Sequence, residues 1–257
     1  ALSLQPDHLQ ARNNLAMLLW EDMDDMAAAD QQYRLLLGSA PTWATARMNY
    51  GVFRLGQGDY ATGWREYEWR WQSEAYSERD WGMGLPRWDG RELGNAGLLI
   101  WGEQGVGDQI LYGTMLADAQ RLCGGRIVVA VEARLLDLFA RSLTGTGVGV
   151  VRRGEPAEAA MQCSFGSLGA LLRLRAADFA GKGQYLRADP ARRAEFRRRY
   201  ERQAGPYRRL IGLSWRSSNR SIGPHKSIPL QKLAPMLRRP EILWINLQYG
   251  ETGAELA

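Results

Sequence analysis

The sequence predicts an α-helical solenoid, then an α/β domain with a parallel sheet, then the beginning of a second α/β domain. Three observations support this prediction. The first third of the chain repeats itself at an offset of 35 residues, short apolar runs alternate with helical patterns from residue 97, and the alternation starts again near residue 210. The expected parts are helical repeats at 1–75, a tryptophan-rich junction at 76–96, a first α/β domain at 97–188, and a connecting helix with an incomplete second domain at 189–257.

The composition excludes several classes of protein. Of the 257 residues, 45% are hydrophobic and 24% are charged, which are values of a folded protein rather than of a disordered one. No apolar run approaches the ~20 residues that a membrane helix needs. Two cysteines and two histidines are too few for a disulfide scaffold or a histidine-rich metal centre. We therefore expect no transmembrane segment, no metal and no cofactor.

The two ends of the chain suggest a fragment. The sequence has no initiator methionine, and Ala1–Pro6 is typical of the last turn of a helix that began earlier. The apolar run at 242–247 is typical of a strand that needs further partners, and the chain closes soon after it. We therefore expect this chain to be part of a longer protein.

Charge is distributed unevenly along the chain. The net charge is +5, but residues 1–75 hold six arginines against ten acidic residues, whereas residues 187–239 hold fifteen basic residues against three acidic ones. Such a basic segment attracts phosphates, nucleotides or nucleic acid. We expect no nucleic-acid partner, because the first third is acidic and no nucleic-acid-binding motif is present. Within the basic segment, residues 190–203 have the composition of a solvated helix.

The repeat in the first third has the character of paired helices. The segment at 56–60, followed by Gly63, Trp64 and Tyr67, resembles the turn and second helix of a tetratricopeptide repeat. Four pairs of identical residues define the offset: Pro6 and Pro41, Ala11 and Ala46, Asn14 and Asn49, Asp24 and Asp59. Two interpretations stay open. The array is a concave surface for a protein partner or a substrate, or it is a helical extension that covers the next domain.

Half of the ten tryptophans lie within residues 64–91, which lead from the helical repeats into the junction. The five are Trp64, Trp69, Trp71, Trp81 and Trp88. Nucleic-acid bases can stack on such rings, and the same rings can fill an interface between two parts of a protein. The local charge is mixed, which favours packing.

The middle of the chain predicts a parallel sheet. Strands are expected at 97–101, 127–131 and 148–151, with one helix running from about Asp108 to Leu122 and another at 135–143. Wholly apolar strands that alternate with helices are typical of a parallel sheet covered on both faces. A similar order begins again with strands at 210–215 and 242–247 around a helix at 229–237.

A glycine loop follows the first expected strand. Gly102, Gly105 and Gly107 give the pattern G-x-x-G-x-G, which is neither the dinucleotide fingerprint nor a phosphate-binding P-loop. Ligands bind at the carboxyl ends of strands in such sheets, and glycines let backbone N–H groups approach them. Asp108 is expected at the start of the following helix, where it either caps the helix or contributes to chemistry. Spacing alone favours the cap.

A second loop, at 216–226, combines hydroxyls and cations after the strand at 210–215. Ser217, Ser218 and Lys226 are typical of a loop that holds a phosphate. The alternative is an ordinary solvated surface loop.

Two longer motifs give the chain a family resemblance. They are Gly-Trp-Arg-Glu-Tyr-Glu-Trp-Arg-Trp at 63–71 and Trp-Gly-Glu-Gln-Gly-Val-Gly-Asp-Gln-Ile at 101–110. Shorter matches fall at 167–168, 185–187 and 226–230. The chain resembles bacterial tetratricopeptide proteins fused to a glycosyltransferase family 9-like domain, which are relatives of the lipopolysaccharide heptosyltransferases. It differs from the heptosyltransferases at Ile228, where they usually have tryptophan.

The resemblance implies a GT-B fold, in which two Rossmann-like domains bind an acceptor and a nucleotide-sugar. It implies inverting transfer of a sugar to an acceptor hydroxyl of a glycan or a protein, with Asp108 as the catalytic base. Lys226, with Ser217 and Ser218, is implied in binding the donor phosphates. Residues expected at the acceptor are Glu103, Gln104, Gly105 and Gly107.

Two other functions remain open. One is protein O-glycosylation, in which the solenoid presents a polypeptide. The other is a non-catalytic interaction module, in which a degenerate transferase domain supports a tetratricopeptide scaffold. The expected location is the cytoplasm, including the inner membrane surface, and the sequence does not identify the sugar or the acceptor.

Overall fold

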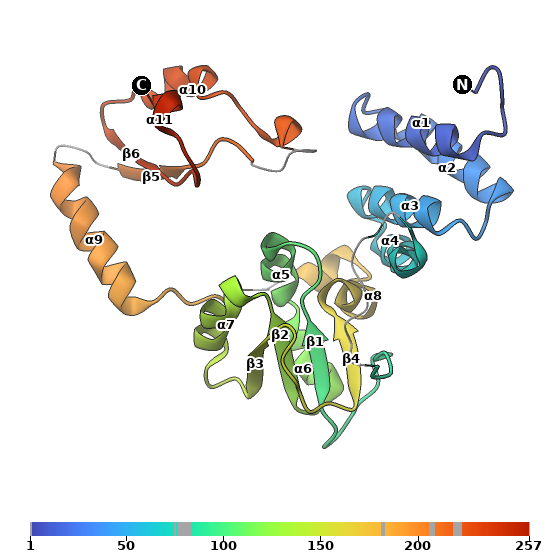
Figure 1. The fold of residues 1–257 in the computed structure, drawn as a ribbon, viewed down its shortest axis with the longest axis horizontal. Coiled ribbons are helices and arrows are strands. Elements are labelled where there is room, and N and C mark those ends of the chain that lie inside the picture. The colour runs from blue at the N-terminus through green and yellow to red at the C-terminus, as the bar shows by residue number, and fades with distance from the viewer. Residues whose placement is uncertain are drawn as a thin grey trace. The chain divides into compact units, whose positions relative to one another are not determined.

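A computed structural model of the protein describes residues 2–74, 76, 84–180, 183–205, 209–217 and 223–256 (Figure 1). The chain forms two compact units, Ala1–Arg187 and Ala188–Ala257. The first unit holds the helices α1 to α8 and a four-stranded sheet, and the second holds α9 to α11 and a two-stranded sheet.

The sheet of the first unit is entirely parallel, as its apolar strands predict. Its strand order is β3-β2-β1-β4, which places β1 between two neighbours. Register aligns Trp101, at the end of β1, with Ala130 on one side and Ser164 on the other. The strands are β1 (Leu98–Trp101), β2 (Ile127–Val131), β3 (Val148–Arg152) and β4 (Met161–Ser164).

The two faces of this sheet are covered differently. One face, which includes Leu98 and Ile100, packs against three helices, α6 (Leu116–Cys123), α7 (Leu136–Leu143) and α8 (Leu168–Leu172). The other face, with Leu99 and Trp101, packs against Trp71, Leu85 and the loop that contains Ala157 and Ala159. All four residues of β1 are at most 1% exposed, so both coverings are needed to bury this strand.

Four helices precede the sheet and pack as two hairpins. Asp25 and Asp59 cap the second helix of each hairpin by accepting a hydrogen bond from Ala28 N (3.0 Å) and Thr62 N (3.2 Å). In the second hairpin, a Cβ at Gly51 would overlap backbone atoms of Tyr67 and Gly63, so the two helices touch through their backbones. The helices are α1 (Leu9–Glu21), α2 (Met26–Ser39), α3 (Ala44–Gly56) and α4 (Tyr60–Tyr67).

The predicted fold class is wrong, because these helices are part of the unit that holds the sheet. The chain is a mixed α/β protein with a parallel four-stranded sheet and eleven α-helices among the described residues, and the structure does not indicate a tetratricopeptide solenoid. The physical reason is direct packing. Trp64 of α4 lies against Gly169 of α8, and the 3₁₀ helix η1 (Glu68–Gln72) places Trp71 on the sheet.

The tryptophan junction is a packing layer, as the mixed charge predicts. Trp64 is 7% exposed and Trp88 is 5% exposed. The rings of Trp71 and Trp101 lie 5.6 Å apart between centroids, and the Arg47 guanidinium lies 4.6 Å from the centre of the Trp69 ring. Trp81 lies outside the described residues.

Two features of the first unit differ from the expected elements. The single helix expected after the glycine loop is divided into α5 (Val106–Gly113) and α6, and the division falls where the Tyr185 hydroxyl lies against Gly113. Strand β4 was not predicted, because Met-Gln-Cys-Ser contains none of the β-branched and aromatic residues that favour strands. The residues Pro86 to Trp88 extend the sheet beyond β4 through hydrogen bonds with the Gln162 backbone.

The second unit has the expected order of strand, helix and strand. Strands β5 and β6 pair in parallel. Helix α9 begins with Asp189 as its cap and Pro190 in its first turn, and its arginines are exposed, as predicted for a solvated helix. The elements are α9 (Pro190–Ala204), β5 (Arg209–Leu213), α10 (Leu230–Leu237), β6 (Ile242–Asn246) and α11 (Gly253–Leu256).

In the part of the chain that the structure describes, no helix has both the length and the apolar composition that crossing a bilayer requires.

The contact between Gly169 and Trp64 gives a test of the packing between α8 and α4. A Cβ at Gly169 would overlap the Trp64 ring, so Gly169→Ala should lower the free energy of unfolding by about 1–3 kcal/mol. The matched control is Gly38→Ala in α2, where the added methyl meets open space and should raise it by roughly 0.5–1 kcal/mol. Urea unfolding followed by circular dichroism measures both changes. Equal effects of the two substitutions would contradict the packing described here.

Candidate functional site

The strand order reverses between β1 and β4. From β1 the chain continues to β2 and β3 on one side, and it then returns to place β4 on the other side. In open parallel sheets, ligands bind beyond the carboxyl ends of the strands at this point. Two loops meet there: the glycine loop at 102–105 and the 3₁₀ helix η3 (Phe165–Ser167) after β4. The carboxyl ends of β1 and β4, with these two loops, form the candidate site.

A buried ion pair occupies the junction of the two loops. The Arg70 guanidinium donates from Nε to Glu103 Oε2 (3.1 Å) and from Nη2 to Glu103 Oε1 (2.8 Å), and both side chains are 0% exposed. Glu103 also accepts hydrogen bonds from the Gly166 N–H (2.8 Å) and from the Tyr76 hydroxyl. The carboxylate therefore receives donors from η1, from η3 and from Tyr76.

The same guanidinium reaches the loop after β4. Its Nη2 donates to Ser164 Oγ (3.1 Å) and Ser167 Oγ (2.8 Å), and its Nη1 donates to Glu68 Oε1 (2.6 Å). The Ser167 hydroxyl in turn donates to Glu68. One arginine thus binds the ends of both strands at once, which its planar fork of donors allows.

The surroundings of Arg70 and Tyr76 fix the protonation state of both side chains. Burial by itself lowers the pKa of Arg70, but the carboxylates of Glu103 and Glu68 more than offset burial, so the net pKa lies above its ordinary value. Burial raises the pKa of Tyr76, and the charge of Glu103 raises it further. Arg70 is therefore a cation and Tyr76 a neutral donor throughout the physiological pH range.

Gln104 has an unusual backbone that two tyrosines support. Its φ is +61°, in the left-handed region that non-glycine residues seldom adopt. Its side-chain amide donates to the hydroxyls of Tyr67 and Tyr76 (3.2 Å to Tyr76). The side chain predicted to bind an acceptor is therefore engaged with Tyr67, at the end of α4, and with Tyr76.

Asp108 lies in the first turn of α5, as predicted. Its Oδ2 accepts a hydrogen bond from the Gly105 N–H (3.1 Å), which is the capping contact, and the side chain is half-buried. A carboxylate has about four lone-pair sites, so one capping bond leaves it able to accept another proton or hydrogen bond. The cap and a chemical role are therefore compatible.

The glycines of the loop have different roles. A Cβ at Gly102 would overlap the Gln109 side chain, which is buried and accepts from the Glu132 N–H (3.0 Å). Gly105 and Gly107 are exposed, and a Cβ at Gly107 would meet open space. Of the four predicted acceptor residues, only these two present backbone to solvent at the edge, because Glu103 is fully buried and Gln104 is half-buried.

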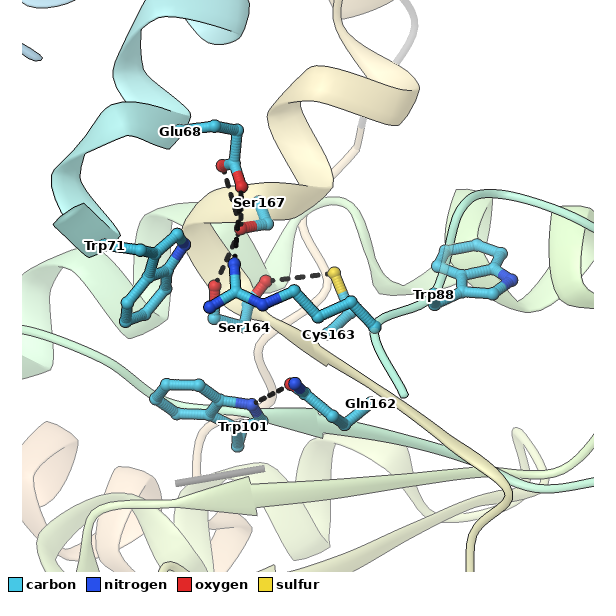
Figure 2. A pocket seen from close by; sticks show the side chains of 9 residues that line it. Glu68, Trp71, Trp88, Trp101, Gln162, Cys163, Ser164 and Ser167 are labelled. Carbon is cyan, nitrogen blue, oxygen red and sulfur yellow. Dashed lines mark hydrogen bonds and ion pairs between the residues drawn. The ribbon is translucent and has the colours of Figure 1, made fainter. Parts of the chain in front are cut away.

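A small cavity lies next to the end of β4, where Ser164 and Ser167 line it (Figure 2). Its volume is about 50 Å³, which accommodates a few water molecules and is well below the ~300 Å³ of small ligand pockets. Burial raises the pKa of the Cys163 thiol, so this residue is not a thiolate nucleophile. The lining residues are Glu68, Trp71, Arg87, Trp88, Trp101, Gln162, Cys163, Ser164 and Ser167.

The predicted phosphate loop belongs to the second unit. Ser217 lines an open hollow together with Trp215, Arg216 and Glu255, and its backbone N–H donates to Ser227 Oγ (3.0 Å). Lys226 is exposed in the 3₁₀ helix η5 (Pro224–Lys226) of the same loop and is not among the residues that line this hollow. Ser218 lies outside the described residues.

Glu255 organises the wall of this hollow. It accepts hydrogen bonds from Trp215 Nε1 (2.5 Å) and Arg216 Nε (2.7 Å), and these contacts lower the pKa of Glu255, with the Trp215 bond as the main cause. The positive charge of Arg216 is therefore already paired, and Lys226 is the predicted cation that stays exposed beside the loop.

Among the described residues, no group of three or more histidine, cysteine, aspartate or glutamate side chains is placed to hold a metal ion.

Comparison with known proteins adds one relative. The chain is 28% identical to Protein FlbA of Caulobacter vibrioides over 278 aligned positions. The alignment covers all of this chain and 46% of FlbA, so the chain spans less than half the length of that protein. No protein-family model matches the chain. The relationship to the heptosyltransferases therefore stays a prediction.

The site residues that the sequence did not identify are those that pair across the chain. Arg70, Tyr76 and Ser164 were not singled out, although Arg70 and Ser167 fall within the segments on which the family resemblance rests. Arg70 and Glu103 are 33 residues apart, and Arg70 and Ser164 are 94 apart. A single sequence holds no signal that joins such distant positions.

The left-handed backbone of Gln104 gives a test of the loop geometry. Gln104→Gly and Gln104→Ala both remove the bonds to the tyrosines, but only alanine retains the steric cost of positive φ. The glycine variant should therefore be more stable than the alanine variant by about 1 kcal/mol.

A helical position supplies the control for this comparison. At Gln31, which is exposed within α2, the order should reverse, because glycine costs roughly 0.5–1 kcal/mol relative to alanine in a helix. Thermal unfolding of the four variants measures both differences. If alanine is the more stable replacement at both positions, the backbone assigned to Gln104 is incorrect.

Proposed function

We propose that the protein is a glycosyltransferase-like enzyme that transfers a sugar from a nucleotide-sugar to an acceptor hydroxyl with inversion at the anomeric carbon. The observation that carries this proposal is the position of Asp108. Its half-buried carboxylate follows a glycine loop at the carboxyl end of β1, where the strand order reverses. This is where a parallel sheet of this kind presents reactive groups to a ligand.

In the proposed reaction, Asp108 acts as the general base. The acceptor hydroxyl attacks the anomeric carbon, its proton passes to the Asp108 carboxylate, and the bond to the nucleoside diphosphate breaks. The Gly105 N–H and the amino end of α5 stabilise the charged carboxylate. In this step the transfer of the proton accompanies the formation of the bond rather than precedes it.

The exposed backbone of Gly105 and Gly107 is the proposed contact with the acceptor. The Gly107 N–H can donate to an acceptor oxygen, because it lies in the first turn of α5 and a Cβ there would meet open space. The Gly105 N–H already donates to Asp108, so Gly105 contributes only its exposed surface. Gln104 and Glu103 then act behind this surface by shaping the loop. The acceptor is a hydroxyl-bearing molecule of the glycan or protein class, in a cytoplasmic or inner-membrane setting.

The second unit contributes the proposed donor site. Its open hollow is lined by Ser217, with Lys226 exposed in the same loop, and a hydroxyl and a cation are suited to the charge of a leaving diphosphate. Ser218 belongs to this proposal from the sequence alone. The donor site requires no metal, because Lys226 supplies the positive charge.

A second function has an observation in its favour. The polar groups between β1 and β4 are extensively bonded to one another, and the cavity beside them has room only for water. This arrangement suits a non-catalytic interaction module built on a transferase-like sheet. The two functions differ in whether Asp108 takes part in chemistry.

Substitution of Asp108 in the full-length protein distinguishes these functions. Asp108→Asn retains an acceptor for the Gly105 N–H, so the fold and donor binding should survive, but it cannot take a proton. Transfer or donor hydrolysis should fall by roughly 10²–10⁴-fold. Mass spectrometry of UDP-, ADP-, GDP- and CMP-linked sugars, incubated with the protein, measures donor consumption.

Asp108→Ala separates the cap from the base. This variant should lose about 1 kcal/mol of stability with the cap, whereas Asp108→Asn should lose little. Near-normal donor turnover by Asp108→Asn would exclude the catalytic role. The absence of turnover of every donor by the unsubstituted protein would favour the interaction module.

A further inference from the structure

The helical part of the first unit takes part in the geometry of the glycine loop. Arg70 lies in η1, directly after α4, and its side chain is 0% exposed. Its five N–H groups lie within hydrogen-bond distance of six acceptor atoms in three segments of the chain. The acceptors are Tyr67 O, Glu68 Oε1, both oxygens of Glu103, Ser164 Oγ and Ser167 Oγ.

The connection continues from Glu103 to Asp108 through a short and fully anchored segment. Gln104, next to Glu103, is held in its left-handed conformation by the Tyr67 and Tyr76 hydroxyls. The Gly105 N–H is bonded to the Asp108 carboxylate. A displacement of Glu103 therefore moves the cap of α5, because only two residues separate it from Val106, where α5 begins.

We propose that Arg70 is a positioning residue that fixes the glycine loop and, through it, the Asp108 carboxylate, so that the segment from α4 to η1 is a constitutive part of the site. This inference rests on the proposed function for the role of Asp108. Arg70 touches no reacting atom. It acts by holding Glu103 and the two serines in one arrangement, and Glu103 in turn accepts from the Gly166 N–H.

The position of the Asp108 carboxylate affects the rate because proton transfer depends steeply on distance. A general base works only within hydrogen-bond reach of the proton that it accepts, and a misplacement of about 1 Å can cost roughly 10²-fold in rate. Lysine retains the positive charge of Arg70 but presents a single ammonium group in place of the planar fork. Arg70→Lys therefore cannot bind both Glu103 oxygens and both serines with the same geometry.

The chain contains a matched control for the loss of a buried arginine. Arg173 donates to Asp118 Oδ2 (2.6 Å), and Arg173 is 3% exposed. This pair joins the end of α8 to α6, two elements that lie outside the glycine loop at 102–105. Arg173→Lys should therefore disturb a buried ion pair of similar kind without moving Asp108.

The experiment compares Arg70→Lys with Arg173→Lys in the full-length protein. Both should lower Tm, by roughly 10 °C. Hydrogen exchange followed by mass spectrometry should show at least about tenfold faster exchange at residues 102–112 in Arg70→Lys only. Donor turnover should fall by about 10²-fold in kcat in Arg70→Lys, with donor KM unchanged, and should remain normal in Arg173→Lys.

The exchange measurement needs no turnover, so it separates this inference from the proposed function. Unchanged exchange at 102–112 in Arg70→Lys, or an equal increase in Arg173→Lys, overturns the positioning role. If exchange changes as expected but the unsubstituted protein consumes no donor, the proposed function fails and Arg70 still positions the loop.

A milder variant keeps the test decisive if Arg70→Lys does not fold. Tyr76→Phe removes one donor to Glu103 without removing a charge. It should speed exchange at 102–112 by a few-fold and lower kcat in the same direction. If Tyr76→Phe has the same exchange rate at 102–112 and the same kcat as the unsubstituted protein, the proposal is overturned.

Discussion

The ion pair between Arg70 and Glu103 joins the helical segment of the first unit to the loop at the carboxyl end of β1. Both charges are removed from water, and a buried charge is tolerated only when its partners satisfy it fully. Glu103 meets this condition with donors from Arg70, Tyr76 and Gly166, and Arg70 meets it with two carboxylates and two serine hydroxyls. The glycine loop, the end of β4 and η1 therefore have one mutually consistent arrangement.

This constraint explains why the helices and the sheet form one unit. The connection from β3 to β4 has no helix that could cover the sheet, so the face with Leu99 and Trp101 is covered by Trp71 and loops instead. Burial of these aromatic rings stabilises the same contact that the ion pair specifies. Helix α4 adds Trp64, which reaches α8 because Gly169 has no side chain. The helical segment is thus a layer of the α/β unit.

Capping and catalysis place compatible demands on Asp108. The bond to Gly105 fixes the orientation of the carboxylate without using all of its lone pairs, and orientation is what a general base requires. The loop before it is held in an uncommon conformation by hydrogen bonds to Tyr67 and Tyr76, and burial raises the pKa of both tyrosines above its ordinary value. Rigidity at this edge therefore comes from hydrogen bonds of the helical layer rather than from the glycine pattern.

The sequence by itself determined the local elements. Apolar runs identified β1, β2, β3, β5 and β6, and the position of Asp108 after the glycines identified the start of α5, because these signals depend on neighbours along the chain. The sequence did not determine β4, the division between α5 and α6, or the fold class. β4 is a strand because Gln162 pairs with β1 and with the 86–88 segment, and α5 ends where Tyr185 lies against Gly113. The repeat of 35 residues predicted the paired helices correctly. It did not predict that these helices belong to the same unit as the sheet, because that packing depends on contacts such as the one between Arg70 and Glu103. Only the tertiary structure decided those contacts, since the free energy of a buried ion pair depends on partners that are far apart in the sequence and adjacent in space.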